Sequence, residues 1–158
     1  LDIRRQLAKT NPADHQPHVA QTLNNLATLY GETQRIKEAK AAYQEALDIR
    51  RQLAKTNPAA YQPDVATTLN SRAIFDITTD NFSQATKDVE EALSINRERW
   101  KTNPTVAADD LARSLLIDVL VKQDLTAKCQ LVKEAASIAH DPQIIATAQK
   151  QMAACTSP

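Results

Sequence analysis

The chain has 158 residues, and its 19 basic and 19 acidic side chains cancel to a formal net charge of zero. Without a basic excess to neutralise phosphates, and without RNA-recognition or zinc-finger patterns, no nucleic-acid binding is expected. The single glycine, Gly31, excludes phosphate-binding loops and dinucleotide fingerprints, because these motifs need several glycines where the backbone approaches phosphate.

The same composition predicts an all-α protein. Glycine is scarce, Ala, Leu, Gln, Lys and Glu are abundant, and alternating β-branched runs are missing. No apolar run approaches the roughly 18–20 residues that span a bilayer, so no membrane span is expected. Because the chain begins at Leu1 without methionine or a signal-like segment, we expect a piece of a larger multidomain protein. The compartment stays open, with the cytoplasm favoured over export.

A ten-residue motif recurs at a fixed interval along the chain. The sequence IRRQLAKTNP occupies residues 3–12 and again 49–58, and an eroded copy occupies 95–104. The Asn-Pro pairs begin at residues 11, 57 and 103, each 46 residues after the previous one. A constant period of this size indicates a stack of structural repeats in which each repeat contacts its neighbours.

The first elements follow from apolar stripes at helical spacing. Residues 1–10 are predicted to be the end of a truncated repeat, closed by Asn11-Pro12 and followed by a linker with Pro12 and Pro17. The first complete repeat is predicted over 18–57. Its first helix starts near His18, residues 31–34 form the turn, and the second helix runs from Ile36 to about Thr56.

Two further repeats and a cap are predicted. The second repeat covers 64–103, with Asp64 and Asp80 as the N-caps of its helices. A degenerate third repeat covers 109–140, starting at Asp109 or Asp110 with a helix that is apolar almost all round and therefore buried on several sides. Residues 141–155 form a capping helix, in which Asp141 is the N-cap and Pro142 the first helical residue.

The first repeat carries the pattern of a known family. The segment LNNLATLY at 23–30, with the small and aromatic residues that follow it, resembles a tetratricopeptide repeat of the kinesin-light-chain type. The positions that match are Ala27, Tyr30, Ala39, Tyr43 and Ala46. The second repeat departs from the pattern at Arg72, Asp76 and Val89, and the third keeps little of it. The resemblance implies one domain, 1–158, a right-handed α-solenoid of antiparallel helix pairs, and protein or peptide binding in a concave groove.

In similar repeats one stripe of each first helix lines the groove. That stripe comprises Gln21, Asn24, Thr28, Thr67, Asn70, Ile74, Arg113, Leu116 and Leu120. Asn24 and Asn70 are the sharpest candidates, because a carboxamide can donate to and accept from an extended peptide backbone. Alternatively these two are solvated, or they bond each other between repeats. Leu116 and Leu120 either form an apolar pocket or are covered, and coverage is favoured.

Arginines recur on the second helices, with acidic residues nearby. They are Arg4, Arg5, Arg50, Arg51, Arg97 and Arg99. A ladder of these side chains could bind an acidic partner. A solvated face paired with its own carboxylates, for example through Asp48 and Arg51, is the favoured interpretation, because the total charge is zero.

Neither catalysis nor a metal site is indicated. His15, His18 and His140 are not accompanied by a Cys-x-x-Cys or His-Glu-x-x-His set, and no serine has a glycine elbow or a nearby histidine. We therefore expect no enzyme, no cofactor and no metal. Cys129 and Cys155 lie at similar distances from the turn near residue 140. Two free thiols are expected, and a disulfide, which would imply an oxidising compartment, is the alternative.

The sequence thus predicts a protein–protein interaction scaffold that binds a peptide or helical segment. The alternative is self-assembly into a homo-oligomer, because the helix at residues 1–10 would expose a repeat face to another copy.

Overall fold

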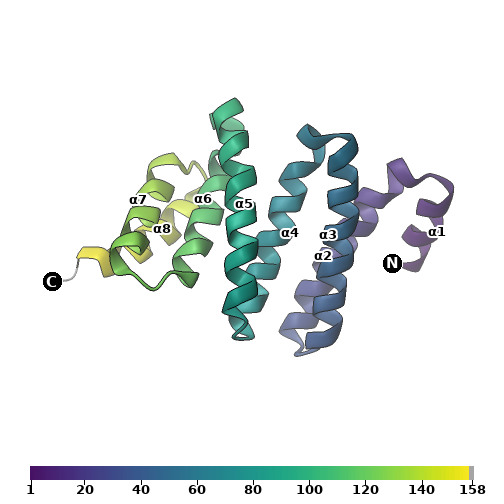
Figure 1. The fold of residues 1–158 in the computed structure, drawn as a ribbon, viewed down its shortest axis with the longest axis horizontal. Helices are drawn as coiled ribbons and strands as arrows, with labels where there is room; N and C mark the ends of the chain where they lie inside the picture. Colours follow the sequence, from purple (N-terminus) through teal and green to yellow (C-terminus); the bar gives the residue numbers. More distant parts are fainter. Residues whose placement is uncertain (157–158) are drawn as a thin grey trace. The chain divides into compact units, whose positions relative to one another are not determined.

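The computed structural model describes residues 1–156, which form helices and short connections and contain no strand. The prediction of an all-α fold of helical repeats is confirmed (Figure 1). In the described range, no helix is both long and apolar enough to cross a bilayer. The helices are α1 (Asp2–Thr10), α2 (Pro12–Glu32), α3 (Ile36–Thr56), α4 (Pro58–Thr78), α5 (Phe82–Thr102), α6 (Pro104–Val121), α7 (Leu125–Ile138) and α8 (Pro142–Thr156).

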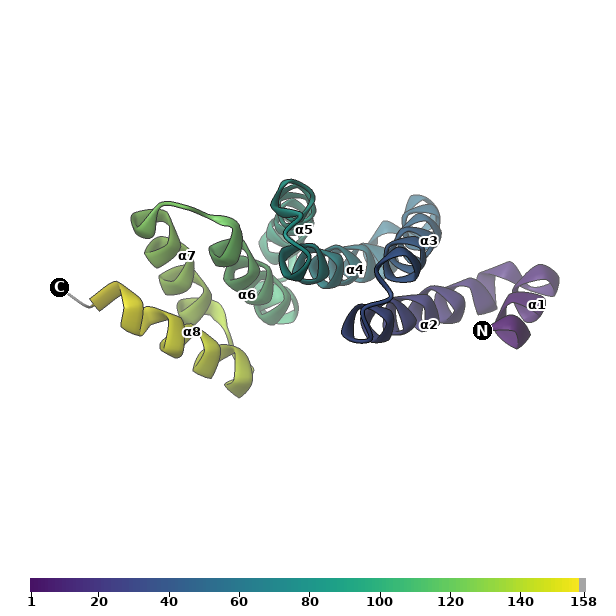
Figure 2. The same cartoon turned by 90° about the horizontal axis from the view of Figure 1, so that it is seen from below.

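The chain forms two compact units. Unit 1 is Leu1–Phe75 and contains α1, α2, α3 and most of α4; unit 2 begins at Asp76 and contains the remaining helices. Within unit 1, α2 packs on both α1 and α3. Within unit 2, α5, α6 and α7 each pack on the next helix in the chain, and α8 also reaches α6 (Figure 2).

The first helix of each repeat begins at an earlier residue than the sequence analysis predicts. α2, α4 and α6 each start at the proline of an Asn-Pro pair, so the expected starts near His18, at Asp64 and at Asp109 or Asp110 are wrong. The asparagine before each proline is extended, with φ between −139° and −146°, because the proline ring excludes the α conformation from the preceding residue. At the first helical position the missing N–H is not needed, so the same proline that ends one helix starts the next.

Pro17, which was expected in a linker, lies inside α2, and Pro63, 46 residues later, lies inside α4. Each lacks the N–H that would bond the carbonyl four residues earlier. Those earlier residues, Ala13 and Ala59, are exposed, so water can bond their carbonyl groups. The helices therefore continue through both prolines.

The core of unit 1 joins α2, α3 and the end of α4. Its buried members are Val19, Leu23, Ala27, Ala39, Ala42, Tyr43, Ala46 and Phe75. The alanines let the helices approach closely, and the rings of Tyr43 and Phe75 lie with centroids 5.7 Å apart. Gly31 lies in the last turn of α2, not in the turn that was predicted, and a Cβ there would be 2.9 Å from Cδ2 of Phe75. Glycine, which has no Cβ, therefore leaves the room that the ring of Phe75 needs.

Unit 2 is centred on α6, which is buried on several sides as expected. Leu111, Leu115 and Ile117 are among its buried residues. Asp141 caps α8 as predicted, its Oδ1 accepting from the backbone N–H of Gln143 at 2.8 Å. The predicted cap of α5 by Asp80 is wrong: Asn81 is the N-cap, and Asp80 has a φ of 57° in the turn before it.

Cys129 of α7 and Cys155 of α8 form a disulfide, so the expectation of two free thiols is wrong. The short connection after α7 makes the two helices antiparallel, which brings the two Cα atoms to 5.7 Å despite a separation of 26 residues. This distance is the usual one for a bridge. Stable bridges of this kind are typical of oxidising compartments.

Candidate interaction surface

On α2, the expected groove residues form a short polar row. Asn24 is only 7% exposed, and its Oδ1 is buried without a hydrogen-bond partner. Gln21 is exposed and accepts from Nη2 of Arg50 at 2.8 Å, while its own Nε2 donates to Oδ1 of Asn25 at 2.9 Å. The hydroxyl of Thr28 lies 3.0 Å from the hydroxyl of Tyr43. Asn24 is thus flanked, one turn to either side, by side chains held in fixed positions.

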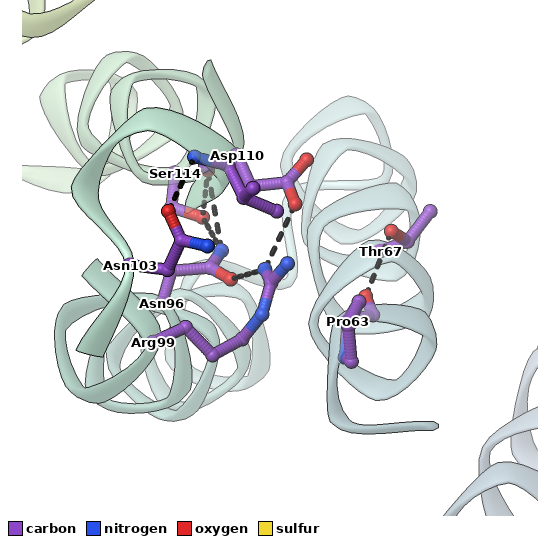
Figure 3. Close-up of polar contacts among 8 residues, drawn as sticks. Pro63, Thr67, Asn96, Arg99, Asn103, Asp110 and Ser114 are labelled. Carbon is purple, nitrogen blue, oxygen red and sulfur yellow. Dashed lines mark hydrogen bonds and ion pairs between the residues drawn. The ribbon is translucent and has the colours of Figure 1, made fainter. Parts of the chain in front are cut away.

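On α4, the expected residues differ in their accessibility. Thr67 is exposed, and its hydroxyl donates to the carbonyl of Pro63 at 2.9 Å (Figure 3). Asn70 is buried, whereas the side chain of Ile74 is 47% exposed. Ile74 therefore presents an apolar contact one turn beyond the buried carboxamide, on the same helix.

In unit 2, the three expected groove residues on α6 also differ in how exposed they are. Arg113 is exposed, Leu116 is buried, and Leu120 is 47% exposed. Coverage, the favoured interpretation, therefore describes Leu116 but not Leu120. Leu120 and Ile74 occupy the same position of the 46-residue repeat, so each unit has an exposed aliphatic side chain at that position.

A recurring set of hydrogen bonds, which we call the clasp, ties α1 to α2, α3 to α4 and α5 to α6. A side chain of the earlier helix donates both to a backbone carbonyl and to a hydroxyl four residues further along the later helix. The hydroxyl donates in turn to the same carbonyl. The clasps comprise Arg4, His18 and Thr22; Arg50, Asp64 and Thr68; and Asn96, Asp110 and Ser114.

The second clasp buries a guanidinium group that also contacts Gln21, one of the expected groove residues. Arg50 is 1% exposed, and its Nη1 donates to the carbonyl of Asp64 at 2.9 Å and to the hydroxyl of Thr68. Its Nη2 reaches Gln21, and its Nε has no hydrogen-bond partner. Burial lowers the pKa of Arg50, and the nearby Asp64 charge opposes that effect. Arg50 therefore supports Gln21 from within the unit.

The third clasp uses a shorter side chain and recruits a second residue. Nδ2 of Asn96 donates to the carbonyl of Asp110 at 3.2 Å and to Oγ of Ser114 at 3.0 Å (Figure 3). Nη1 of Arg99 donates to Oδ1 of Asn96 and to Oδ2 of Asp110, both at 2.8 Å. A guanidinium group is thus present at this clasp as well, supplied from one turn further along α5.

The remaining arginines include pairs with carboxylates of neighbouring second helices. Arg5 contacts Glu45 at 2.6 Å, and Arg97 contacts Glu134 at 2.9 Å. These pairs are largely exposed and therefore weak, worth about 0–1 kcal/mol each. They agree with the predicted self-paired face. Arg50 does not belong to that face, because it is buried. The only signal in the sequence for its place in a clasp is that it lies 46 residues after Arg4, which contacts Thr22.

The titratable residues show no metal-binding cluster. Across residues 1–156, no three side chains of His, Cys, Asp or Glu gather in a group that could hold an ion. The carboxylate of Asp109 accepts from the backbone N–H groups of Asp141 and His140. These bonds lower the pKa of Asp109.

Comparison with known proteins identifies the repeat. Residues 19–59 match the family model described as tetratricopeptide repeat, whereas no curated protein matches the chain. The matched stretch contains most of α2 and all of α3, the helix pair that carries Asn24, Tyr43 and Arg50. The match, the 46-residue period and the antiparallel helix pairs agree, and residues 19–59 are therefore a repeat of the tetratricopeptide type within a chain of helical repeats.

Proposed function

We propose that the candidate surface of unit 1 binds an extended peptide, with Asn24 as its main polar contact. The general role of tetratricopeptide repeats, which is protein–protein interaction, supports this proposal. The residues assigned to this surface are Gln21, Asn24 and Thr28 of α2 and Thr67, Asn70 and Ile74 of α4. Arg113, Leu116 and Leu120 are the corresponding residues of unit 2, with Leu120 as the accessible contact.

The buried Oδ1 of Asn24 carries the proposal. A buried acceptor without a partner costs roughly 1–3 kcal/mol, so a ligand whose N–H reaches Oδ1 after a small rotation of the carboxamide recovers that free energy. A peptide backbone has such a donor at nearly every residue, and its carbonyl can accept from the Nδ2 of the same carboxamide. Ile74 adds an exposed aliphatic contact for a side chain of the ligand.

Affinity for a selected peptide tests this assignment. A displayed random-peptide library is selected on the wild-type chain, and the dissociation constant of the best peptide is then measured for Asn24→Ala. We expect the affinity to fall about tenfold or more, because one hydrogen bond to a buried group is lost. The double variant Asn24→Ala/Asn70→Ala is expected to weaken binding further.

Lys40→Ala is the matched control, because Lys40 is an exposed residue of α3 that is not assigned to this surface. Its affinity for the peptide should equal that of the wild type. Equal binding by the wild type and the Asn24→Ala variant, with the helical circular dichroism unchanged, would remove Asn24 from the binding surface.

A second candidate function, self-association, rests on the exposed face of α1. Ile3 is 74% exposed and Leu7 44%, whereas Leu53, the equivalent of Leu7 one period later, is 8% exposed. A second copy of the chain could cover this face. Sedimentation equilibrium distinguishes the functions: a dimer that Ile3→Glu converts to monomer supports self-association, whereas a wild-type monomer at micromolar concentration speaks against it.

A further inference from the structure

The helix that closes unit 2 is held at three separate points. At its start, Oδ1 of Asp109 accepts from the backbone N–H of His140 at 2.6 Å and from that of Asp141 at 2.9 Å. In its first half, Ile144 and Ala148 are buried. Near its end, Cys155 is bonded to Cys129 of α7.

The second half of α8 depends on the disulfide far more than the first half does. None of residues 149–155 is buried, so this part contributes little apolar surface to the core of the unit. Gln151 has a buried Oε1 without a hydrogen-bond partner, which opposes docking of the same segment. The covalent bond to α7 therefore holds a segment that its own packing holds weakly.

The two sulfur-bearing residues are accessible and differ in their surroundings. Cys129 and Cys155 are both only partly buried, so a thiol in solution can reach the bridge. Cys129 is the fifth residue of α7, in the half nearer the positive end of that helix, with Lys128 directly before it and Lys133 one turn after it. Cys155 lies in the last turn of α8, at the negative end. A thiolate that leaves the bridge is therefore better stabilised on Cys129 than on Cys155.

We propose that the Cys129–Cys155 bridge is a thiol-exchange site at which a low-molecular-weight thiol releases the second half of α8. The attacking thiolate bonds to Sγ of Cys155, the S–S bond breaks, and its electron pair leaves on Sγ of Cys129, which then takes up a proton. A second thiol attacks the mixed disulfide, leaving Cys155 as a thiol and the two small thiols joined as their own disulfide. The bridge gains two electrons, and the two thiols lose them.

The test treats the native, oxidised chain with glutathione and follows it by mass spectrometry and amide hydrogen exchange. After acid quenching, we expect the mixed disulfide on Cys155. We also expect residues 149–155 to exchange about tenfold or more faster than in the oxidised chain, at labelling times too short for the amides of α6 and α7 to exchange. The proposal is overturned if the bridge resists glutathione until denaturant is added, if glutathione is attached mainly to Cys129, or if all three helices lose protection together.

The double variant Cys129→Ser/Cys155→Ser is the matched control. Without glutathione it should show the rapid exchange of residues 149–155, and glutathione should leave that exchange unchanged. Protection of this segment equal to that of the oxidised wild type would show that packing holds it, and the proposal would fail. If the variant does not fold, the glutathione experiment on the wild-type chain still decides the matter.

Discussion

At the scale of single residues, Arg50 shows how a repeat position changes character with its surroundings. In the first clasp Arg4 is exposed, and in the second Arg50 makes the same contacts while almost completely buried. A buried guanidinium group is tolerated only where several acceptors replace its water, and Asp64, Thr68 and Gln21 supply them. The clasp therefore contributes more to stability at the second position than at the first.

Replacing Arg50 by alanine should lower the free energy of unfolding by about 2–4 kcal/mol, because hydrogen bonds to a buried charge are lost and a cavity remains. Arg4→Ala is the matched control and should cost less than about 1 kcal/mol, because Arg4 is exposed. Urea denaturation followed by circular dichroism measures both variants. Equal losses would contradict a special role for the buried clasp.

At the scale of elements, the helices were predictable where a local signal determined them. The end of α3 at Thr56 and the start of α8 at Pro142 follow from an Asn-Pro and an Asp-Pro pair. The start of α2 was not predictable in the same way, because Asn11-Pro12 ends one helix and also begins the next. A proline in sequence is consistent with a linker or with a first helical turn, and tertiary packing decides between them.

The candidate site was predictable only in part, for a similar reason. Periodicity predicts which residues of α2 share a stripe, and Asn24 and Thr28 do lie beside each other on that helix. Burial depends on the neighbouring helices, which a period in one helix does not reveal. Hence the burial of Asn24, Arg50 and Leu116 emerges only when the helices are assembled. The same holds for the Cys129–Cys155 bridge, which needs the antiparallel pairing of α7 and α8.

The two hydrogen bonds that Asp109 accepts at the start of α8 should weaken in acid. The backbone N–H groups of Asp141 and His140 hold the pKa of Asp109 below its ordinary value of 3.8. A carboxyl group whose pKa is lowered on folding stabilises the fold above its unfolded value, and that contribution is lost as the pH falls through the folded value. The bonds to residues 140 and 141 should therefore persist at pH 4 and weaken only at lower pH.

Amide chemical shifts of His140 and Asp141, followed by NMR during an acid titration, report on these two hydrogen bonds. Both amides should move together, with a midpoint below 3.8. In Asp109→Asn, which keeps an acceptor oxygen but does not titrate, this shared transition should be absent. A midpoint at or above 3.8 in the wild type would contradict the anchoring of Asp109.

At the scale of the whole molecule, the two units are stabilised by different means. Unit 1 has the Tyr43–Phe75 core and the buried Arg50 clasp but no cysteine. Unit 2 has the bridge, which closes a loop of 26 residues near its end. In repeat proteins each element is stabilised chiefly by its immediate neighbours, so a change at one end need not reach the other. A change in redox conditions should therefore affect unit 2 selectively.

This selectivity has a convenient readout, because the only tryptophan, Trp100, lies in unit 2 and all three tyrosines, Tyr30, Tyr43 and Tyr61, lie in unit 1. A bridge that closes a loop of this length stabilises by about 3 kcal/mol, because it restricts the unfolded chain. After reduction, the urea midpoint reported by Trp100 fluorescence should fall, whereas the midpoint reported by fluorotyrosine NMR should not change. If both midpoints fall together, the units unfold as one cooperative structure, and the bridge stabilises the whole chain through the coupling between its repeats.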